Sequence, residues 1–528
     1  MNGSRAAQMP AGIPFIVANE FAERFCFYGI NSVLALYLVQ SMHFGEAQAT
    51  TWVSLFKSGA YLFPLLGAVV ADVYWGKFRT VIVFSLAYCA GCAALALARD
   101  SLAIGIGLSL IALGTGGIKP CVATNVGDQF TSANHQLIER AFSWFYLAIN
   151  AGSTISILLC PVLLARYGPA AGFGLPAAMM CLALAVFWTG RTRFAVVAPA
   201  GRAWLHDVLS GSGMFTILRL LVVYLFIAFF WALWDQSNGA TWSLQARSNL
   251  MDKRLGFGIT LLAAQIQAVN AVLILLFVPL FSYLLYPLIG RLVKVTPLRK
   301  IGAGLFITAG SFLVIAWIEA RIQAGVVVSV WWQILAYVIL TAGEVLVSIT
   351  GLEYSYRQAP LAMKSFIMAL FLLSVSVGNL FTAAVNHYMI RPLPVLSLEA
   401  GRPTWLRVAR YETLVIGQKI DFSGQSGVEV LGPDGRVSAL QGTYLVGTVQ
   451  ADSGRVLLLD AVSREPLATR GSLDAAHATV STYRLVGPAY FLFFAGIMAA
   501  AATVFVLVAT RVAETTHLRD EAGDIVGA

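Results

Sequence analysis

The sequence predicts an all-α polytopic membrane protein whose helices form two bundles of six, with a small β-rich insert outside the membrane. Of its 528 residues, 58% are apolar and 12% are charged, and the mean hydropathy is +0.77. These values are typical of a chain that crosses a membrane several times, and they exclude an ordinary soluble domain. A hydrophilic joint at 191–213 divides the apolar stretches into two sets of six.

Twelve apolar stretches have the length that an α-helix needs to cross a hydrocarbon core of about 30 Å. We expect spanning helices at 15–40, 51–71, 80–98, 102–124, 141–165, 170–190, 214–243, 262–290, 301–320, 331–356, 365–388 and 486–510. Two such bundles around a central cavity are typical of secondary transporters.

The segment 389–485 interrupts this pattern, because it is polar, nearly balanced in charge and without helical periodicity. Short β-rich runs such as 428–431 precede turn sequences, which indicates a small β-rich domain. It carries no catalytic constellation, and a passive lid or spacer is the simplest role. The expected units are a bundle at 1–190, a linker at 191–213, a second bundle at 214–388 and 486–510, the insert at 389–485 and a tail at 511–528.

Lysine and arginine are unevenly distributed between the two sets of loops, and the richer set includes both termini. The positive-inside rule therefore places both termini in the cytoplasm and the insert outside, in a plasma membrane or a bacterial inner membrane. The net charge of +9 is interpreted as loop charge and not as a nucleic-acid surface. All six cysteines lie in apolar segments without metal-ligand spacing, so we expect no metal site and no cofactor.

The first apolar stretch contains three charges, Glu20, Glu23 and Arg24. Each costs roughly 2.5–3.5 kcal/mol or more in hydrocarbon. Glu20 and Arg24 are four residues apart and share a helix face. Two carboxylates beside one arginine are able to hold an extra proton, which suits proton coupling. The alternative is a structural ion pair that clamps the helix.

Helix 2 ends in a glycine-rich, charged segment, 67–80. Asp72 with Lys77 and Arg79 is expected to form a charge latch between helices, which indicates a gate. Ordinary loop charges are the alternative interpretation.

Lys119 and Glu344 are opposite charges in apolar helices of the two different halves. Such a pair suits recognition of a zwitterion, whereas snorkelling of the lysine to the interface is the alternative. Asn150 is a candidate for hydrogen bonding to a substrate amide, or for contact between helices. Asp235 in helix 7 and Asn270 in helix 8 are further polar groups within apolar helices.

Together these motifs resemble the proton-dependent oligopeptide transporter (POT) family of the major facilitator superfamily. The resemblance rests on Glu20-x-x-Glu23-Arg24-Phe25 with Tyr28-Gly29, the segment 67–80, Lys119-Pro120, the run 145–152, the run 230–233 and Gly343-Glu344. It covers both halves and omits the insert.

The resemblance implies proton-driven uptake of di- and tripeptides without an enzymatic step or a cofactor. By this resemblance, Glu20, Glu23 and Arg24 couple protons, Glu344 holds the peptide amino group, and Arg24 and Lys119 lie toward its carboxylate. The positions of Tyr28, Tyr61, Asn150 and Asn270 match residues that line the pocket. The partners would be peptides, protons and the lipid bilayer, with the monomer as the working unit.

The sequence also departs from the family pattern. Asn31 stands where an outer-gate arginine is usual, so Asp235 is expected to lack a cation and to gate by protonation alone. Phe27 replaces a usual tyrosine, and Ser54 aligns with the helix 2 histidine of animal members. Proton binding would then fall on carboxylates: Glu20, Glu23, Asp235 and Glu344.

Two alternatives stay open at this point. The chain could transport another small zwitterion or an anion, although the intact Glu20/Glu23/Arg24 group argues against a nitrate-type branch. It could instead be a membrane receptor whose insert binds a ligand without transport. An enzyme is disfavoured because the sequence shows no nucleophile–base pair and no metal-ligand cluster.

Overall fold

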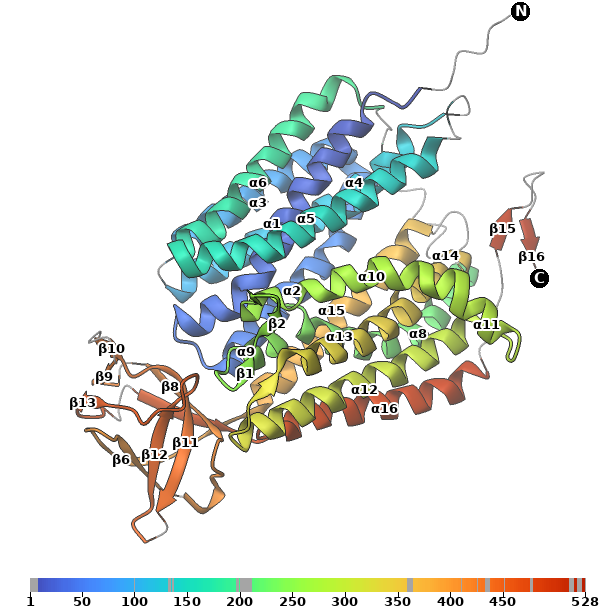
Figure 1. Ribbon diagram of the computed structural model, residues 1–528. Coiled ribbons are helices and arrows are strands. Elements are labelled where there is room, and N and C mark those ends of the chain that lie inside the picture. Colours follow the sequence, from blue (N-terminus) through green and yellow to red (C-terminus); the bar gives the residue numbers. More distant parts are fainter. Residues whose placement is uncertain are drawn as a thin grey trace, which may run out of the picture.

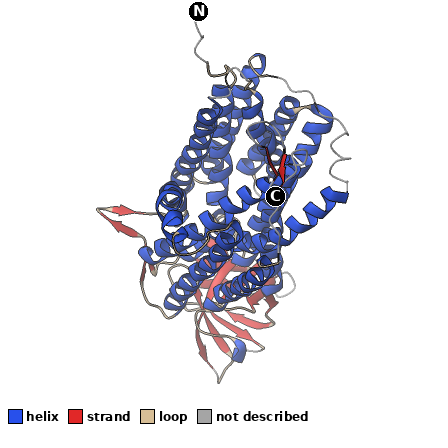
Figure 2. Cartoon of the chain, turned by 90° about the vertical axis from the view of Figure 1, so that its right-hand side faces the viewer, coloured by secondary structure: helices blue, strands red, loops and turns tan. Residues whose placement is uncertain are grey.

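The computed structural model describes residues 8–511, together with 517–519 and 525–527. Within 8–511 it leaves out 99, 132–133, 135–136, 196–198, 200–210, 359–363, 410, 425, 433–436, 451 and 475–477, so most of the expected linker lies outside the described residues. Long helices make up most of the protein, and a β-rich segment lies at one end of them (Figures 1 and 2).

The N-terminal helix group consists of six long helices. They are α1 (Ile13–Gln40), α2 (Glu46–Val69), α3 (Lys77–Leu97), α4 (Ser101–Asp128), α5 (Ile138–Tyr167) and α6 (Pro169–Thr189). A π-helical turn, η1 (Val70–Trp75), extends α2. Helix α1 packs on α5 and α6, and α4 packs on α2 and α3.

Glycines let α3 and α4 approach closely. A methyl group on Gly91 would lie 2.7 Å from the carbonyl oxygen of Gly107, and one on Gly114 would lie 2.8 Å from the carbonyl oxygen of Phe84. Backbones at this separation gain dispersion contacts that larger side chains would prevent.

The C-terminal helix group has more interruptions. Its members are α8 (Gly211–Ser237), α9 (Thr241–Ala246), α10 (Ala268–Leu280), η5 (Phe281–Leu285), α11 (Tyr286–Gly290), α12 (Pro297–Gln323), α13 (Val330–Glu344), η6 (Val345–Ile349), α14 (Thr350–Gln358), α15 (Lys364–Met389) and α16 (Pro488–Ala509). Three of the expected spanning segments, at 214–243, 262–290 and 331–356, are present and each contains an irregular turn. The first is broken where Gly239 adopts a φ of 81°, and the other two contain the π turns η5 and η6.

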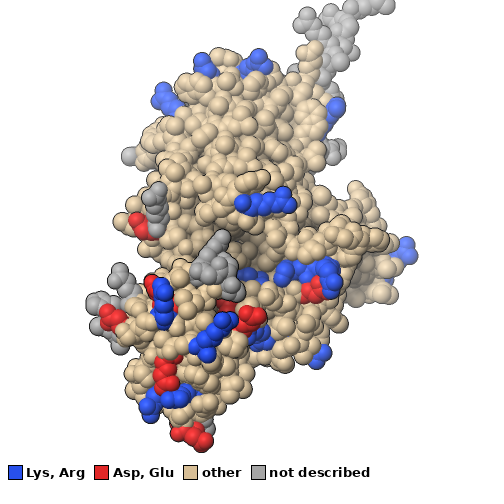
Figure 3. All heavy atoms as spheres, turned by 60° about the vertical axis from the view of Figure 1, so that its left-hand side comes forward, with Lys and Arg blue, Asp and Glu red and all other residues tan. Residues whose placement is uncertain are grey.

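Eleven of the described helices, some joined by π turns, are long and apolar enough to cross a membrane. Helix α1 has comparable length, with 28 residues, but contains Glu20, Glu23 and Arg24. Charged side chains are sparse over much of the helical surface visible in Figure 3, whereas both signs are interspersed over the β-rich end.

Residues 390–483, here called the cap, form two antiparallel sheets. The larger sheet has the strand order β5-β14-β8-β11-β12-β7-β6, and the smaller has β10-β9-β13. Their bounds are β5 (Ile390–Pro392), β6 (Val395–Glu399), β7 (Trp405–Val408), β8 (Lys419–Gly424), β9 (Val428–Leu431), β10 (Val437–Ala439), β11 (Gly442–Gln450), β12 (Arg455–Asp460), β13 (Thr469–Gly471) and β14 (Ala478–Tyr483). A separate apolar core that includes Leu406, Phe422 and Val456 holds the sheets together.

The two helix groups meet near the cap and diverge away from it (Figure 1). Helix α2 packs along α15 across the boundary between the groups, which we call the seam. The first turns of α2, α4 and α13 lie at the cap end, and the first turns of α1, α3 and α12 lie at the opposite end.

The close approach of α3 and α4 makes a testable prediction. We expect Gly114→Ala to lower the apparent melting temperature in detergent by several degrees, because its methyl group meets the backbone of α3. Gly174→Ala is the matched control, since nothing lies within 4 Å of the added methyl group. Equal melting temperatures for the two variants would contradict this packing.

Candidate functional site

The three charges of α1 form one compact cluster. Arg24 Nε lies 2.6 Å from Glu20 Oε1 and 3.2 Å from Glu23 Oε2. Thr115 Oγ1 on α4 donates a hydrogen bond of 3.0 Å to Glu23 Oε1. Both carboxylates are buried, at 1% and 0% exposure, so two acids compete for one guanidinium in a site of low dielectric.

Lys119 lies inside α4 with its ammonium between two aromatic rings. Its Nζ atom is 4.1 Å from the centre of the Phe27 ring and 4.0 Å from that of Tyr61. The nitrogen is buried and has no hydrogen-bond partner among the described residues. The lysine therefore does not snorkel to an interface.

Glu344 is a predicted acidic site residue of the C-terminal group, and Asn270 holds it. Asn270 Nδ2 on α10 donates to Glu344 Oε2 over 2.7 Å and to Thr341 Oγ1 over 3.0 Å. Glu344 is the last residue of α13, directly before the π turn η6. Single π turns inside helices frequently mark functional sites. The Tyr28 ring on α1 packs edge-on against Phe27, with ring centres 5.6 Å apart.

Asp235 has a cation after all, so the expectation that it lacks one was wrong. Lys57 Nζ on α2 lies 3.1 Å from Asp235 Oδ1 and also donates to the carbonyl oxygens of Asp235 and Asn238 at 3.0 and 2.6 Å. Asn379 Nδ2 donates to the other carboxylate oxygen at 2.6 Å. Lys57 and Asp235 are 2% and 5% exposed. Sequence reasoning missed Lys57, although a lysine in an apolar helix was the available signal.

Asn31 belongs to the same part of the seam. Its side-chain nitrogen lies 3.0 Å from the carbonyl oxygen of Asn238, just before Gly239. Gly239 has a φ of 81°, and a methyl group there would collide with the backbone of Asn31. Asn31 thus contacts the loop between α8 and α9.

The predicted latch at the other end of the groups is only partly present. Lys77 forms an ion pair with Asp128 at the end of α4, which sequence reasoning did not single out. Arg79 is exposed, and the side chain of Asp72 lies outside the described residues. Asn150 donates to the carbonyl oxygen of Tyr146 in its own helix at 2.8 Å.

Contacts between the two groups concentrate in the half nearer the cap. Besides Lys57 and Asn31, Ser58 Oγ on α2 and Ser376 Oγ on α15 are 2.8 Å apart, and Gln265 on the C-terminal side donates to Leu158 of α5 at 2.8 Å. The polar contacts named here all lie in that half. The seam is therefore closed at the cap end, and the cluster of charges lies on the diverging side.

Comparison with known proteins decides the family. A family model described as the POT family matches residues 78–210 and 208–394, which together exceed half of the chain. The chain belongs to the POT family.

Individual relatives agree with this assignment. Solute carrier family 15 member 2 of Danio rerio is 36% identical over 367 residues, which are 60% of this chain and 51% of that protein. The chain thus spans about half the length of the curated relatives that it matches. The crystal structure of the POT family transporter PepTSo is 31% identical, with a TM-score of 0.71 over 96% of this chain and 99% of that one. A proton dependent oligopeptide (POT) family transporter is 37% identical, with a TM-score of 0.62 over 71% and 91%.

In the part of this POT protein that the structure describes, no group of three or more His, Cys, Asp or Glu side chains could hold a metal ion. The charged side chains named above are distributed over the two helix groups. They include paired charges at Lys57–Asp235 and Glu20/Glu23/Arg24, and a buried ammonium without a hydrogen-bond partner at Lys119.

The pair Lys57–Asp235 predicts a double-mutant pattern. Either Lys57→Met or Asp235→Asn leaves a buried polar group without its partner, and each is expected to destabilise the protein by about 3–5 kcal/mol. The double variant is expected to lose clearly less than the sum of the two, because neither charge is then left alone. Thermal unfolding in detergent measures all three. Additive losses would show that the two side chains do not interact.

Proposed function

We propose that this POT protein is a proton-coupled symporter that imports di- and tripeptides. It would have twelve transmembrane helices in two six-helix bundles of the major facilitator type, working by alternating access as a monomer in the plasma membrane. The bundles would be 1–190 and 214–388 with 486–510, joined by the linker 191–213. Support comes from the family and from the distribution of charges across the two helix groups.

One observation carries the proposal. The buried ammonium of Lys119 has no hydrogen-bonding partner among the described residues, while the carboxylates near it are engaged with Arg24. A buried cation without an anion is costly, so the site favours an incoming carboxylate. Glu344 offers an acid for an ammonium group on the other side. A peptide has both charges at its ends, whatever its side chains are.

The remaining site residues fit the middle of such a ligand. Peptide backbone amides require neutral donors and acceptors between the two charged ends. Tyr28, Tyr61, Asn150 and Asn270 supply these groups from both helix groups. Arg24 and Lys119 would share the peptide carboxylate, and Glu344 with Asn270 would take the amino end.

Proton coupling follows from competition for Arg24. In the structure both Glu20 and Glu23 contact this guanidinium. A peptide carboxylate that binds Arg24 would weaken its hold on these acids, and one of them would then take up a proton. Glu344 and Asp235 are further carboxylates that could bind protons, one where the ammonium binds and one in the seam.

The positive-inside rule places the cap outside and both termini in the cytoplasm. The structure would then be inward-facing, with Lys57, Asp235 and Asn31 in a closed outer gate. Asp72, Lys77 and Arg79 would act at the cytoplasmic end in the outward-facing state. Sequence reasoning assigned Asp235 to this gate without its partner, and Lys57 supplies it.

Uptake into proteoliposomes tests the proposal. Dialanine should accumulate only with an inward proton gradient. Glu20→Gln and Lys119→Ala should reduce accumulation by about ten- to a hundredfold, because each removes a charged contact worth about 1.5–3 kcal/mol. Glu20→Gln should retain peptide exchange, since exchange requires no net proton movement.

Arg470→Gln is the matched control, because Arg470 forms an exposed ion pair with Glu429 inside the cap. Its uptake should equal that of the unmodified protein. Saturable binding of dialanine without accumulation would contradict transport and support a receptor. Accumulation that ignores the proton gradient would contradict symport.

A further inference from the structure

The cap is fixed to the C-terminal helix group. Strand β5 follows α15 directly, and a short segment after β14 leads into α16. Arg464 Nη1 also donates to the carbonyl oxygen of Ile322 at the end of α12, at 2.6 Å. Gln323 donates to Ile416 in the cap at 3.3 Å. When the two helix groups move relative to each other, the cap must therefore move with the C-terminal group.

The same cap reaches across the seam to the first turn of α2 in the N-terminal group. Helix α2 begins after Gly45, which has no side chain to accept a hydrogen bond from the free backbone N–H groups. The cap supplies these acceptors. The N–H of Glu46 donates to Thr443 Oγ1 at 3.1 Å, and the N–H of Ala47 donates to the hydroxyl of Tyr483 at 3.3 Å.

Both hydroxyls in turn donate hydrogen bonds to one acid of the cap, Asp421. Thr443 Oγ1 donates to Asp421 Oδ1 at 2.7 Å, and the hydroxyl of Tyr483 donates to Asp421 Oδ2. Asp421 lies directly against Gly45, where any Cβ atom would collide with its carboxylate. An acid at the N-terminus of a 24-residue helix is favoured by the helix dipole. The cap thus acts as an N-cap for α2 from another part of the chain.

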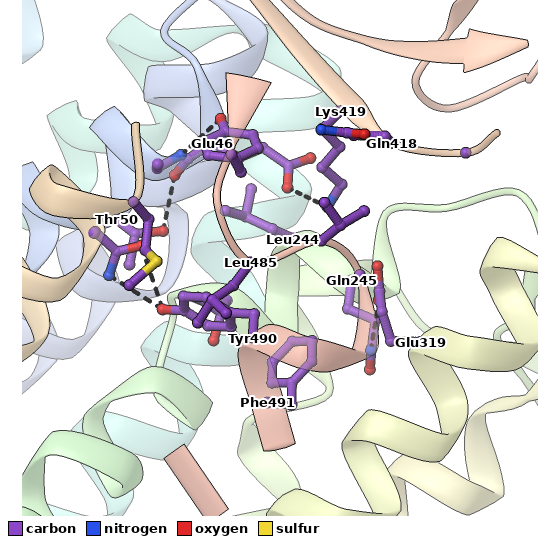
Figure 4. A pocket seen from close by; sticks show the side chains of 18 residues that line it. Glu46, Thr50, Leu244, Gln245, Glu319, Gln418, Lys419, Leu485, Tyr490 and Phe491 are labelled. Carbon is purple, nitrogen blue, oxygen red and sulfur yellow. Dashed lines mark hydrogen bonds and ion pairs between the residues drawn. The ribbon is translucent and has the colours of Figure 1, made fainter. Parts of the chain in front are cut away.

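An ion pair reinforces this contact. Lys419 Nζ on β8 lies 2.6 Å from Glu46 Oε2 on α2, as Figure 4 shows. Next to it is a cavity of about 90 Å³ whose walls come from α2, α9, α12, α15, α16 and the cap. Because this cavity lies beside them, the contacts between α2 and the cap are less tightly packed than a protein core. An ion pair such as Lys419–Glu46 separates at modest cost.

We propose that the cap is an outer clamp that holds the cap end of the seam closed and slows its opening. The inference rests on the alternating access of the proposed function. Opening at this end would draw α2 away from the C-terminal group, and the cap would have to release α2 because the chain joins the cap to α15 and α16. The contacts of Glu46, Ala47 and Gly45 therefore stabilise only the closed state, which shifts the equilibrium toward it.

Labelling of a cysteine in the seam tests the clamp. Ser58→Cys places a thiol at a residue that is 3% exposed and faces Ser376. Cys181, the only exposed cysteine among the described residues, is replaced by serine in the background. A membrane-impermeant thiol reagent, added from the cap side to sealed proteoliposomes, then reports how often the seam opens.

Lys419→Gln, which removes the ion pair across the seam, should raise the labelling rate about two- to fivefold. Tyr483→Phe, which removes one acceptor for α2, should act in the same direction. Arg470→Gln is the matched control, because its 2.6 Å pair with Glu429 lies wholly within the cap. It should leave the rate unchanged.

Rates for Lys419→Gln and Tyr483→Phe that equal the control would overturn the clamp. So would an equal acceleration by all three variants, since that would indicate general loosening of the cap. Labelling needs neither peptide nor proton gradient, so it is independent of transport. If the seam variants label faster but no variant accumulates dialanine, the proposed function fails and the clamp stands.

Discussion

The ion pair between Lys57 and Asp235 is the interaction on which the arrangement of the two helix groups depends. Both side chains are almost fully buried, and they belong to helices on opposite sides of the seam. Separating them in a dry interior would leave two uncompensated charges, which is far more costly than breaking an exposed pair. The seam can open at this point only if water, a proton or another partner replaces the contact.

Buried charges are paired at the cap end of the seam, whereas the diverging side contains an ammonium without a hydrogen-bond partner among the described residues. At the cap end, Lys57, Asp235 and Asn31 all have partners across the seam. On the diverging side, the Lys119 ammonium lies against two aromatic ring faces and has no hydrogen-bond partner in the part of the chain that the structure describes. A ring face stabilises a cation by about 0.5–2 kcal/mol, which falls short of what a buried carboxylate would supply. The closed end is thus electrostatically complete, and the open side has a place for an anion.

The sequence was sufficient for much of this site, and the reasons are local. Glu20, Glu23 and Arg24 meet because their spacing places them on one helix turn, and Lys119 stands out because ammonium groups are rare in apolar helices. Lys57 carries the same signal and was overlooked, but its pairing with Asp235, 178 positions away, depends on tertiary packing that the sequence does not show. The π turns after Glu344 and Leu280 could not be predicted from the spacing of apolar residues, because one extra residue in a turn leaves that spacing almost unchanged.

The cap illustrates the same limit. Its strands follow from alternating residues and turns, but its contact with Gly45 and Glu46 depends on how a sheet is placed against a distant helix end. The sequence around Glu46 does not predict that its backbone N–H will donate a hydrogen bond to a hydroxyl on β11. A segment that looked like a passive spacer therefore has specific polar contacts with both helix groups.

Distances between spin labels test most directly whether Lys57 holds the cap end closed. In a background without the six native cysteines, one pair of labels at Leu102 and Trp331 reports the cap end, and another at Tyr74 and Leu292 reports the opposite end; all four positions are exposed. If Lys57 holds the cap end closed, Lys57→Met lengthens the distance between the labels at that end and shortens the distance at the opposite end. An unchanged cap-end distance in this variant would contradict that role.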